Sequence, residues 1–189
     1  MLVRPTTCSV RRASRRAARR GFTLIEAALT TAITGIAFLA IMQLFTACTQ
    51  QNRVGSNMTS AMMLAGHIQE TMTGLSFNDP AFGPTYFGPE PGQTLGGYDD
   101  VDDFDGRVFN PPIDSLRQQI TDQMQFTQTI SVMPVYATQL SSNTDPNSPT
   151  IAKTTYTGSV RVLVRILYRV KPTDGQIEIY RTSWIRVDE

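Results

Sequence analysis

The stretch RGFTLIE, residues 20–26, marks the boundary between an arginine-rich N-terminal segment and a long apolar segment. No charged side chain occurs in the 26 residues from 27 to 52. As an α-helix these residues would be about 39 Å long, which is enough to cross a bilayer. The carboxylate of Glu26 lies at the start of this helix, where a charge costs roughly 2.5–3.5 kcal/mol on membrane-insertion scales. We therefore expect a group of opposite charge to offset that cost.

The positive charge of the arginine-rich N-terminal segment does not show in the net charge of the whole chain. Residues 1–21 contain seven arginines and no acidic residue, although the formal net charge of all 189 residues is only +1. Residues 22–189 therefore carry a net negative charge of about six and show no broad basic footprint for nucleic acid. The arginines adjoin an apolar helix, which favours a signal that keeps the N-terminus in the cytoplasm over a disordered nucleic-acid-binding arm.

Residues 20–26 resemble the cleavage signal of type IV pilins and type II secretion pseudopilins. The resemblance covers about 30 residues and is specific at Gly21, Phe22, Thr23, Leu24, Ile25 and Glu26. It implies that prepilin peptidase cuts after Gly21 and that Phe22 becomes the N-methylated first residue of the mature chain. It also implies assembly roles for Thr23 and Glu26. The Glu26 carboxylate would meet the N-terminal ammonium of a neighbouring subunit, so that two charges that are costly in lipid satisfy each other.

An alternative interpretation uses the same N-terminus. Residues 19–22 also resemble the core of a twin-arginine export signal, and residues 44–48 (LFTAC) loosely resemble a lipobox. Together they would describe an exported lipoprotein anchored at Cys48. Against it, Phe45 is bulky where a lipobox prefers a leucine-like residue. Glu26 would also be unexplained, and the helical pattern continues through Cys48.

A stripe of apolar residues continues the helix beyond its charge-free part. Its members recur at spacings of three or four, which predicts an amphipathic helix that needs a covering surface, most simply a sheet from the same chain. Gly74 and the run of residues 78–80 indicate where the helix ends. The stripe comprises Val54, Met58, Met62, Ala65, Ile68, Met72 and Leu75.

A change to a period of two predicts strands in the last third of the chain. Residues 78–112 contain six prolines and six glycines, which excludes long regular elements there. Strands are expected over 126–137, where Pro134 argues for an edge or a bulge, and over 155–170 and 176–187. On the second strand one face would hold Val160, Val162, Val164, Ile166, Tyr168 and Val170, and the other Arg161, Arg165 and Arg169.

The predicted fold is therefore α+β and pilin-like, with one long N-terminal helix packed on a small antiparallel β-sheet. We expect a cytoplasmic leader over 1–21 that is removed, and a transmembrane and assembly helix over 22–52. An amphipathic continuation would follow over 53–75, and a globular head with a Pro/Gly-rich loop over 76–189.

Residues 98–106 (YDDVDDFDG) place five carboxylates within seven positions. Hard oxygen donors on a turn suit calcium, and the resemblance adds that several pseudopilins hold calcium in a C-terminal loop. Asp102, Asp103 and Asp105 would then be the ligands, although the pattern does not fit an EF-hand loop. A solvated acidic turn and an acidic contact surface are the alternatives. No other cofactor is expected.

Residues that could support catalysis are few. His67 is the only histidine and lies beside the apolar stripe, as a helix-surface or packing residue does. With Cys8 in the expected leader, the mature chain keeps only Cys48, so neither a His/Cys zinc site nor an intrachain disulfide can form. No phosphate-binding loop or nucleophile elbow occurs. We predict a protein that is not an enzyme, and the missing disulfide favours a pseudopilin or minor subunit.

The expected function is that of a structural filament subunit in the inner membrane, with its N-terminus cytoplasmic and its head extracytoplasmic. Its partners would be prepilin peptidase, other pilin or pseudopilin subunits, an inner-membrane assembly platform and the membrane, with no nucleic acid expected. The arginine stripe on the second strand fits a solvated face or a neighbour's acids, or DNA in a minor competence pilin. The sequence leaves secretion pseudopilus, type IV pilus and competence pilus open.

Overall fold

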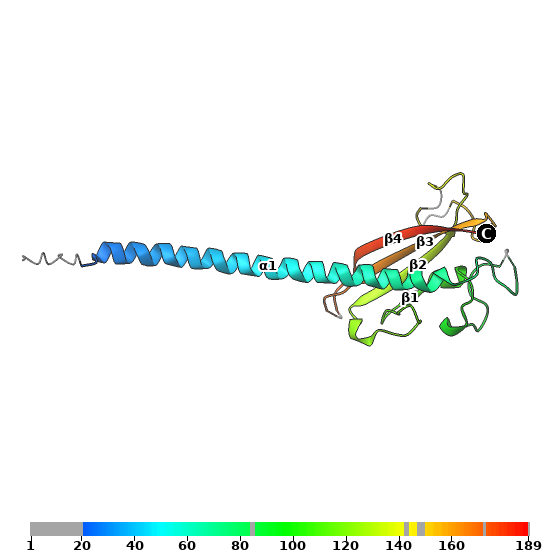
Figure 1. Cartoon of the computed structure of the whole chain (residues 1–189), viewed down its shortest axis with the longest axis horizontal. Coiled ribbons are helices and arrows are strands. Elements are labelled where there is room, and N and C mark those ends of the chain that lie inside the picture. Colours follow the sequence, from blue (N-terminus) through cyan, green and yellow to red (C-terminus); the bar gives the residue numbers. More distant parts are fainter. Residues whose placement is uncertain (1–20, 84–85, 142–143, 147–149, 172, 189) are drawn as a thin grey trace, which may run out of the picture. The chain divides into compact units, whose positions relative to one another are not determined.

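The computed structural model describes residues 21–83, 86–141, 144–146, 150–171 and 173–188. The arginine-rich leader predicted from the sequence therefore lies outside the described residues, except for Gly21. The described chain contains one long helix and four β-strands (Figure 1). It divides into two compact units, one up to Gln50 and the other from Gln51 onward, which are described in turn.

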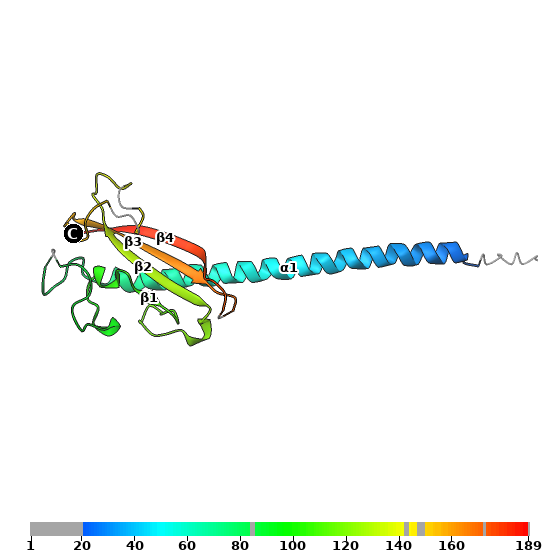
Figure 2. The same ribbon diagram turned by 180° about the vertical axis from the view of Figure 1, so that it is seen from behind.

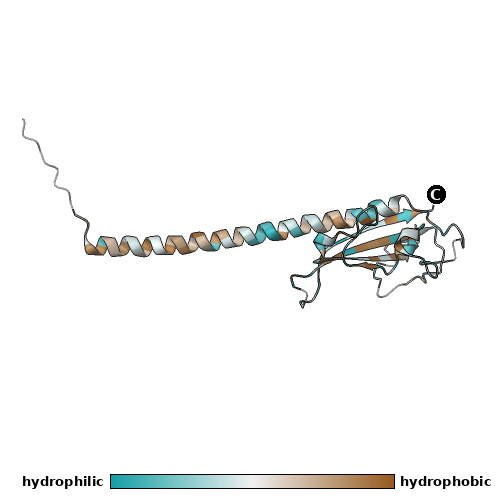
Figure 3. Ribbon diagram, turned by 90° about the horizontal axis from the view of Figure 1, so that it is seen from below, coloured by the Kyte–Doolittle hydropathy of each residue, from teal (hydrophilic) through white to brown (hydrophobic). Residues whose placement is uncertain are grey.

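The first unit consists of the apolar part of α1, a helix that runs from Leu24 to Thr73. At its start the backbone N–H of Glu26 donates to the hydroxyl oxygen of Thr23 at 3.3 Å, as at a threonine N-cap. Every side chain from residue 21 to residue 50 is exposed. Apolar residues dominate the first part of the helix (Figure 3), which is long and apolar enough to span a membrane.

Threonine hydroxyls in this unit are satisfied by the helix itself. Those of Thr30, Thr31 and Thr34 each donate to the backbone carbonyl four residues earlier, at 2.6–2.8 Å. Thr46 and Thr49 do the same farther along. Because these hydroxyls need no outside partner, they are compatible with an apolar environment around the helix.

In the second unit the last turns of α1 bury one face against the sheet. The apolar stripe predicted for this part of the helix was wrong at three positions, since Val54, Met58 and Met62 are 68%, 36% and 48% exposed. Successive helical residues are about 100° apart, so burial of Ala61 turns Met62 outward. The buried apolar face comprises Ala61, Leu64, Ala65, Ile68 and Met72.

The sheet is an antiparallel meander in the order β1-β2-β3-β4, which Figure 2 shows from the second side. Its strands are β1 (Val108–Phe109), β2 (Phe126–Pro134), β3 (Ser159–Tyr168) and β4 (Ile177–Val187). Three of them were predicted from alternation, with β2 and β3 shorter than expected. The two-residue β1 was not predicted, because it lies in the Pro/Gly-rich stretch and is too short to show a period.

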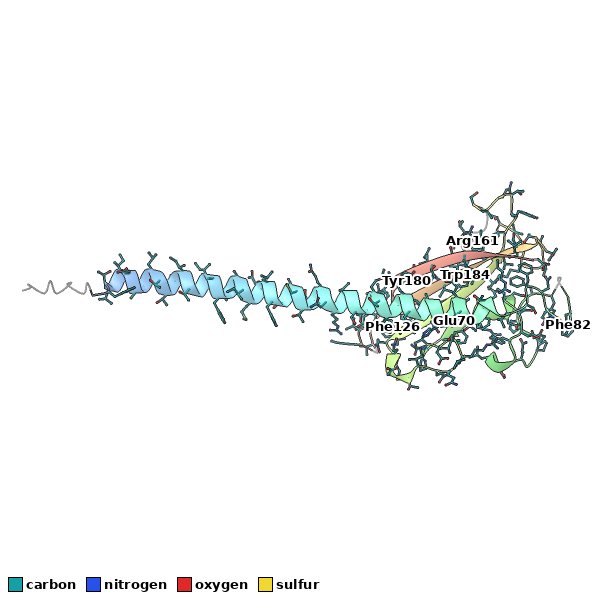
Figure 4. All side chains as sticks on the ribbon, viewed as in Figure 1. Glu70, Phe82, Phe126, Arg161, Tyr180 and Trp184 are labelled. Carbon is teal, nitrogen blue, oxygen red and sulfur yellow. The ribbon has the colours of Figure 1, made fainter. Side chains whose placement is uncertain are left out.

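The inner face of the sheet and the buried face of α1 form one core. Val160, Val162, Val164 and Ile166 of β3 are buried in it, as predicted. The predicted face was wrong at Val170, which lies beyond the end of β3 and is 55% exposed. Tyr180 and Trp184 of β4 pack against the same core (Figure 4).

Two polar side chains tie α1 to the sheet within this unit. The buried amide of Gln128 on β2 donates to the backbone carbonyls of Leu64 and Ile113, at 3.0 and 2.9 Å. The guanidinium of Arg186 on β4 donates to the carbonyls of Met72 and Leu75 at the end of the helix. A cation at that position satisfies carbonyls that have no partner inside the helix and complements the helix dipole.

Candidate functional site

The first candidate site is the junction at residues 21–26, which carries the predicted cleavage and assembly residues. Phe22 is 72% exposed, and Glu26 is exposed in the first turn of α1. Thr23 caps that turn, so its side chain is already used within the chain. Among the described residues no ion pair involves Glu26, since the two that occur are Lys153–Asp105 and Arg181–Glu178. The roles assigned to Gly21, Phe22, Thr23 and Glu26 stay predictions.

The second candidate site is the acidic loop, residues 98–106, which lies between α1 and β1. Apolar side chains at every third position anchor it: Tyr98, Val101 and Phe104 are buried in the core. The rings of Tyr98 and Phe104 meet edge to face, with centroids 5.1 Å apart. Of the carboxylates between these anchors, those of Asp100, Asp102 and Asp103 are also buried, whereas Asp99 is exposed.

Backbone bonds hold the acidic loop on the end of α1. The N–H of Ser76 donates to the carbonyl of Asp99 at 3.1 Å, and the N–H of Val101 donates to the carbonyl of Ser76 at 3.2 Å. Ser76 and Asp100 form a parallel β-bridge at this point. The single 3-10 turn Asp102–Phe104 then carries the chain toward β1.

The three carboxylates predicted as calcium ligands have different surroundings. Asp102 accepts a hydrogen bond from the backbone N–H of Gly88 at 2.7 Å. Asp105 accepts one from the N–H of Val132 at 2.9 Å and forms an ion pair with Lys153. Asp103 is fully buried, and its Oδ2 accepts from the N–H of Asp99 at 2.9 Å.

The structure brings Asp103 together with two carboxylates that the sequence-based ligand set left out. One oxygen each from Asp99, Asp100 and Asp103 lies within 4.8 Å of the other two. Asp100 is also buried, whereas Asp99 is exposed. The spacing of the apolar anchors places residues 99, 100, 102 and 103 between buried positions, and by itself it does not single out this trio.

Burial dominates the electrostatics of the loop. It raises the pKa of Asp100 to about 8, and the adjacent carboxyl of Asp102 adds to the rise. Burial also raises the pKa of Asp102 and of Asp103. The cause is the same throughout: a charged carboxylate loses hydration in the head and gains no cationic side chain in exchange.

The remaining residues considered from the sequence do not assemble into a catalytic group in the described chain. His67 is half-buried on α1, and its Nδ1 has no hydrogen-bond partner there. Arg161, labelled in Figure 4, donates to the carbonyl of Leu140 across the outer face of the sheet. Arg165 stands opposite Arg181 on β4. Cys48 is an exposed free thiol, and α1 continues through it without a break.

The architecture is pilin-like: a 50-residue N-terminal helix with an apolar first part, packed on a four-stranded antiparallel sheet. Comparison with protein-family models, with curated proteins and with solved structures found no match for this chain.

Proposed function

We propose that this protein is a structural subunit of a type IV pilus-like or type II secretion pseudopilus filament. The observation that carries the proposal is the carboxylate of Glu26, which begins an apolar helix with no cationic partner among the described residues. Its sequence context, five residues after Gly21 and four after Phe22, resembles that of a prepilin cleavage signal. Cutting after Gly21 creates an ammonium group at Phe22. Its positive charge can pair with the carboxylate of Glu26.

Assembly follows from that pairing. Prepilin peptidase removes the leader at the inner membrane, and the Phe22 ammonium of one subunit meets the Glu26 carboxylate of the next. Each charge is costly in lipid by itself, and the pair offsets part of that cost while fixing the axial register between subunits. Small residues let the helices approach closely. They are Ala27, Ala28, Ala32, Gly35, Ala37 and Ala40.

The two units have different roles in this proposal. The head has a core of its own, built from the last turns of α1 and the sheet. The apolar residues of the first unit are exposed and take no part in that core. They are therefore available to lipid before assembly and to neighbouring helices afterwards, with an inner-membrane platform as the expected assembly partner.

The test replaces the carboxylate in the intact protein. Glu26→Ala is expected to leave trimming after Gly21 intact and to abolish recovery of the subunit in sheared filaments. Glu70→Ala is the matched control, because Glu70 is an exposed glutamate on the same helix but in the head unit. Filaments that incorporate Glu26→Ala as well as the control would remove the assembly role of this carboxylate.

A further inference from the structure

We propose that the free edge of β4 binds an extended segment of a different protein chain, which joins the sheet as an added strand. On one face the segment carries apolar side chains toward a groove beside Trp184. On the other face it carries an acidic side chain opposite Arg181. This surface lies entirely within the head unit, and its use does not depend on filament assembly.

The register of β4 against β3 determines which of its main-chain groups face outward. The N–H of Asp188 donates to the carbonyl of Gly158 at 3.0 Å, so Asp188 turns toward β3. Its neighbour Val187 lies opposite Ser159, whose carbonyl accepts from Val135 on the β2 side instead. Residues of an antiparallel strand alternate in this way, and the register is regular from 180 to 187. The N–H and carbonyl groups that face away from β3 are therefore those of Arg181, Ser183, Ile185 and Val187.

The head covers the other edge of its sheet but leaves this one open. Beyond the short β1, the N–H of Ile130 donates to the carbonyl of Arg107 at 2.9 Å. The N–H of Val132 donates to the carboxylate of Asp105, also at 2.9 Å. On the far side of β4, the last strand of the sheet (Figure 2), the described chain supplies no such partner. An open edge of this kind pairs readily with another extended chain.

A groove runs beside the same edge, between β4 and the segment that follows α1. Its volume is about 620 Å³, which is within the range of ligand-binding clefts. Residues 184–187 and 75–77 are among those that line it. Leu75, Phe77 and Trp184 are half-buried apolar side chains of this lining. Because Trp184 lies on the inner face of the sheet, the residue opposite it on an added strand would point toward the groove.

The outer face of the same edge has an arginine without an ion pair. Arg165 on β3 stands directly opposite Arg181 on β4, and like charges at such positions are destabilising. Arg181 forms its ion pair with Glu178, whereas Arg165 forms none in the described chain. The Nε of Arg165 is also buried without a hydrogen-bond partner there. Strands lie about 4.8 Å apart, so an acidic side chain opposite Arg181 would be within reach of both guanidinium groups.

These features specify the chemistry of the partner. The outward N–H and carbonyl groups recur along the edge, so another extended main chain satisfies them together, which a helix or a lipid surface does not do. A second copy that paired antiparallel through the same edge would offer no acid to Arg181. Its own outward-facing positions hold only arginine, serine, isoleucine and valine.

The test titrates the synthetic peptide Thr-Val-Thr-Val-Glu-Val-Thr-Val-Thr into the full chain in detergent. N-methylation of its valines leaves only the edge formed by threonine and glutamate able to pair. A saturable blue shift of the fluorescence of Trp184, the only tryptophan, is expected. The matched control peptide is methylated at threonine and glutamate instead. It is expected to bind about tenfold more weakly or not at all, because its pairing donors are gone.

Hydrogen exchange of single amides gives a pattern that only strand addition produces. The bound peptide is expected to slow exchange strongly at Ser183, Ile185 and Val187. Exchange at Thr182 and Trp184 should change much less, because their N–H groups already face β3. Equal slowing at all five positions would show general stabilisation of the head and would overturn the proposal.

Variants of the protein separate the main-chain contact from the charge contact. Ser183→Pro removes one outward N–H and no bond to β3, and should weaken peptide binding by about tenfold, whereas Ser183→Thr should bind as the parent does. Arg165→Gln should weaken binding of this peptide by about threefold and leave binding of its glutamine analogue unchanged.

Three results would overturn the proposal. They are a parent chain that does not bind the peptide, equal binding of the two methylated peptides, and a dimer that protects residues 183, 185 and 187 without peptide. The last would assign the edge to a second copy. The methylated pair uses the parent chain alone, so it decides the matter even if Ser183→Pro does not fold.

Discussion

The two halves of α1 use apolar residues in opposite ways. Leu39, in the first unit, is 63% exposed, whereas Leu64, in the second unit, has no exposed surface. Both lie on the same continuous helix. The core of the head therefore covers one face of its own helical turns, whereas nothing in the described chain covers the apolar residues of the first unit. A helix that is apolar on every side needs lipid or other helices around it, which is why the first unit implies an environment outside this chain.

The largest expected effect is on the free energy of unfolding, when Leu64 and Leu39 are each replaced by alanine. Leu64→Ala should lower the free energy of unfolding of the head by about 2–5 kcal/mol, because it leaves a cavity in a closed core. Leu39→Ala should change that free energy by less than about 0.5 kcal/mol, because the residue is exposed and is not part of the core of the head. Urea unfolding followed by the fluorescence of Trp184, the only tryptophan, measures both. Equal losses from the two variants would contradict the division of the helix.

The smallest expected effect compares two glutamates. Glu178 on β4 has an intrachain partner, since it accepts a hydrogen bond from Arg181 at 2.7 Å, whereas Glu26 has none among the described residues. The Arg181 guanidinium lowers the pKa of Glu178. A lowered pKa means that the stabilisation is present above the ordinary value of 4.5 and is lost as the pH falls through the lower, folded-state value.

Glu178→Gln should therefore cost the head less than about 0.5 kcal/mol at neutral pH, because the pair is partly exposed and screened by solvent. The difference from the parent chain should vanish at a pH below the lowered pKa. Unfolding in urea at both pH values checks it. A loss above about 1 kcal/mol would show that this surface pair matters more than its exposure indicates.

The sequence was sufficient for the elements that have a long, regular period. The charge-free segment, the end of α1 near Gly74 and the alternation in β3 could all be predicted, because each repeats over several turns or residue pairs. The sequence was insufficient to predict which residues are buried where tertiary packing determines the buried face. The choice between Met62 and Leu64 for the buried face depends on where the sheet meets the helix.

The acidic loop illustrates the same limit. Its composition left a calcium site, a solvated acidic turn and an acidic contact surface open, and the ligand choice of Asp102, Asp103 and Asp105 stays a prediction. In the structure Asp105 forms an ion pair with Lys153, and Asp102 accepts a hydrogen bond from the backbone N–H of Gly88. These contacts come from residues 14 to 48 positions away, so no local pattern in residues 98–106 could have indicated them.

The most direct test of the central claim is the mass of the mature N-terminus, measured on protein purified from the membrane fraction. We predict a chain that begins at Phe22, with or without one added methyl group, because cutting after Gly21 must expose the ammonium that pairs with Glu26. A chain that begins at a lipidated Cys48, or one that keeps its leader, would contradict the proposal of a processed filament subunit.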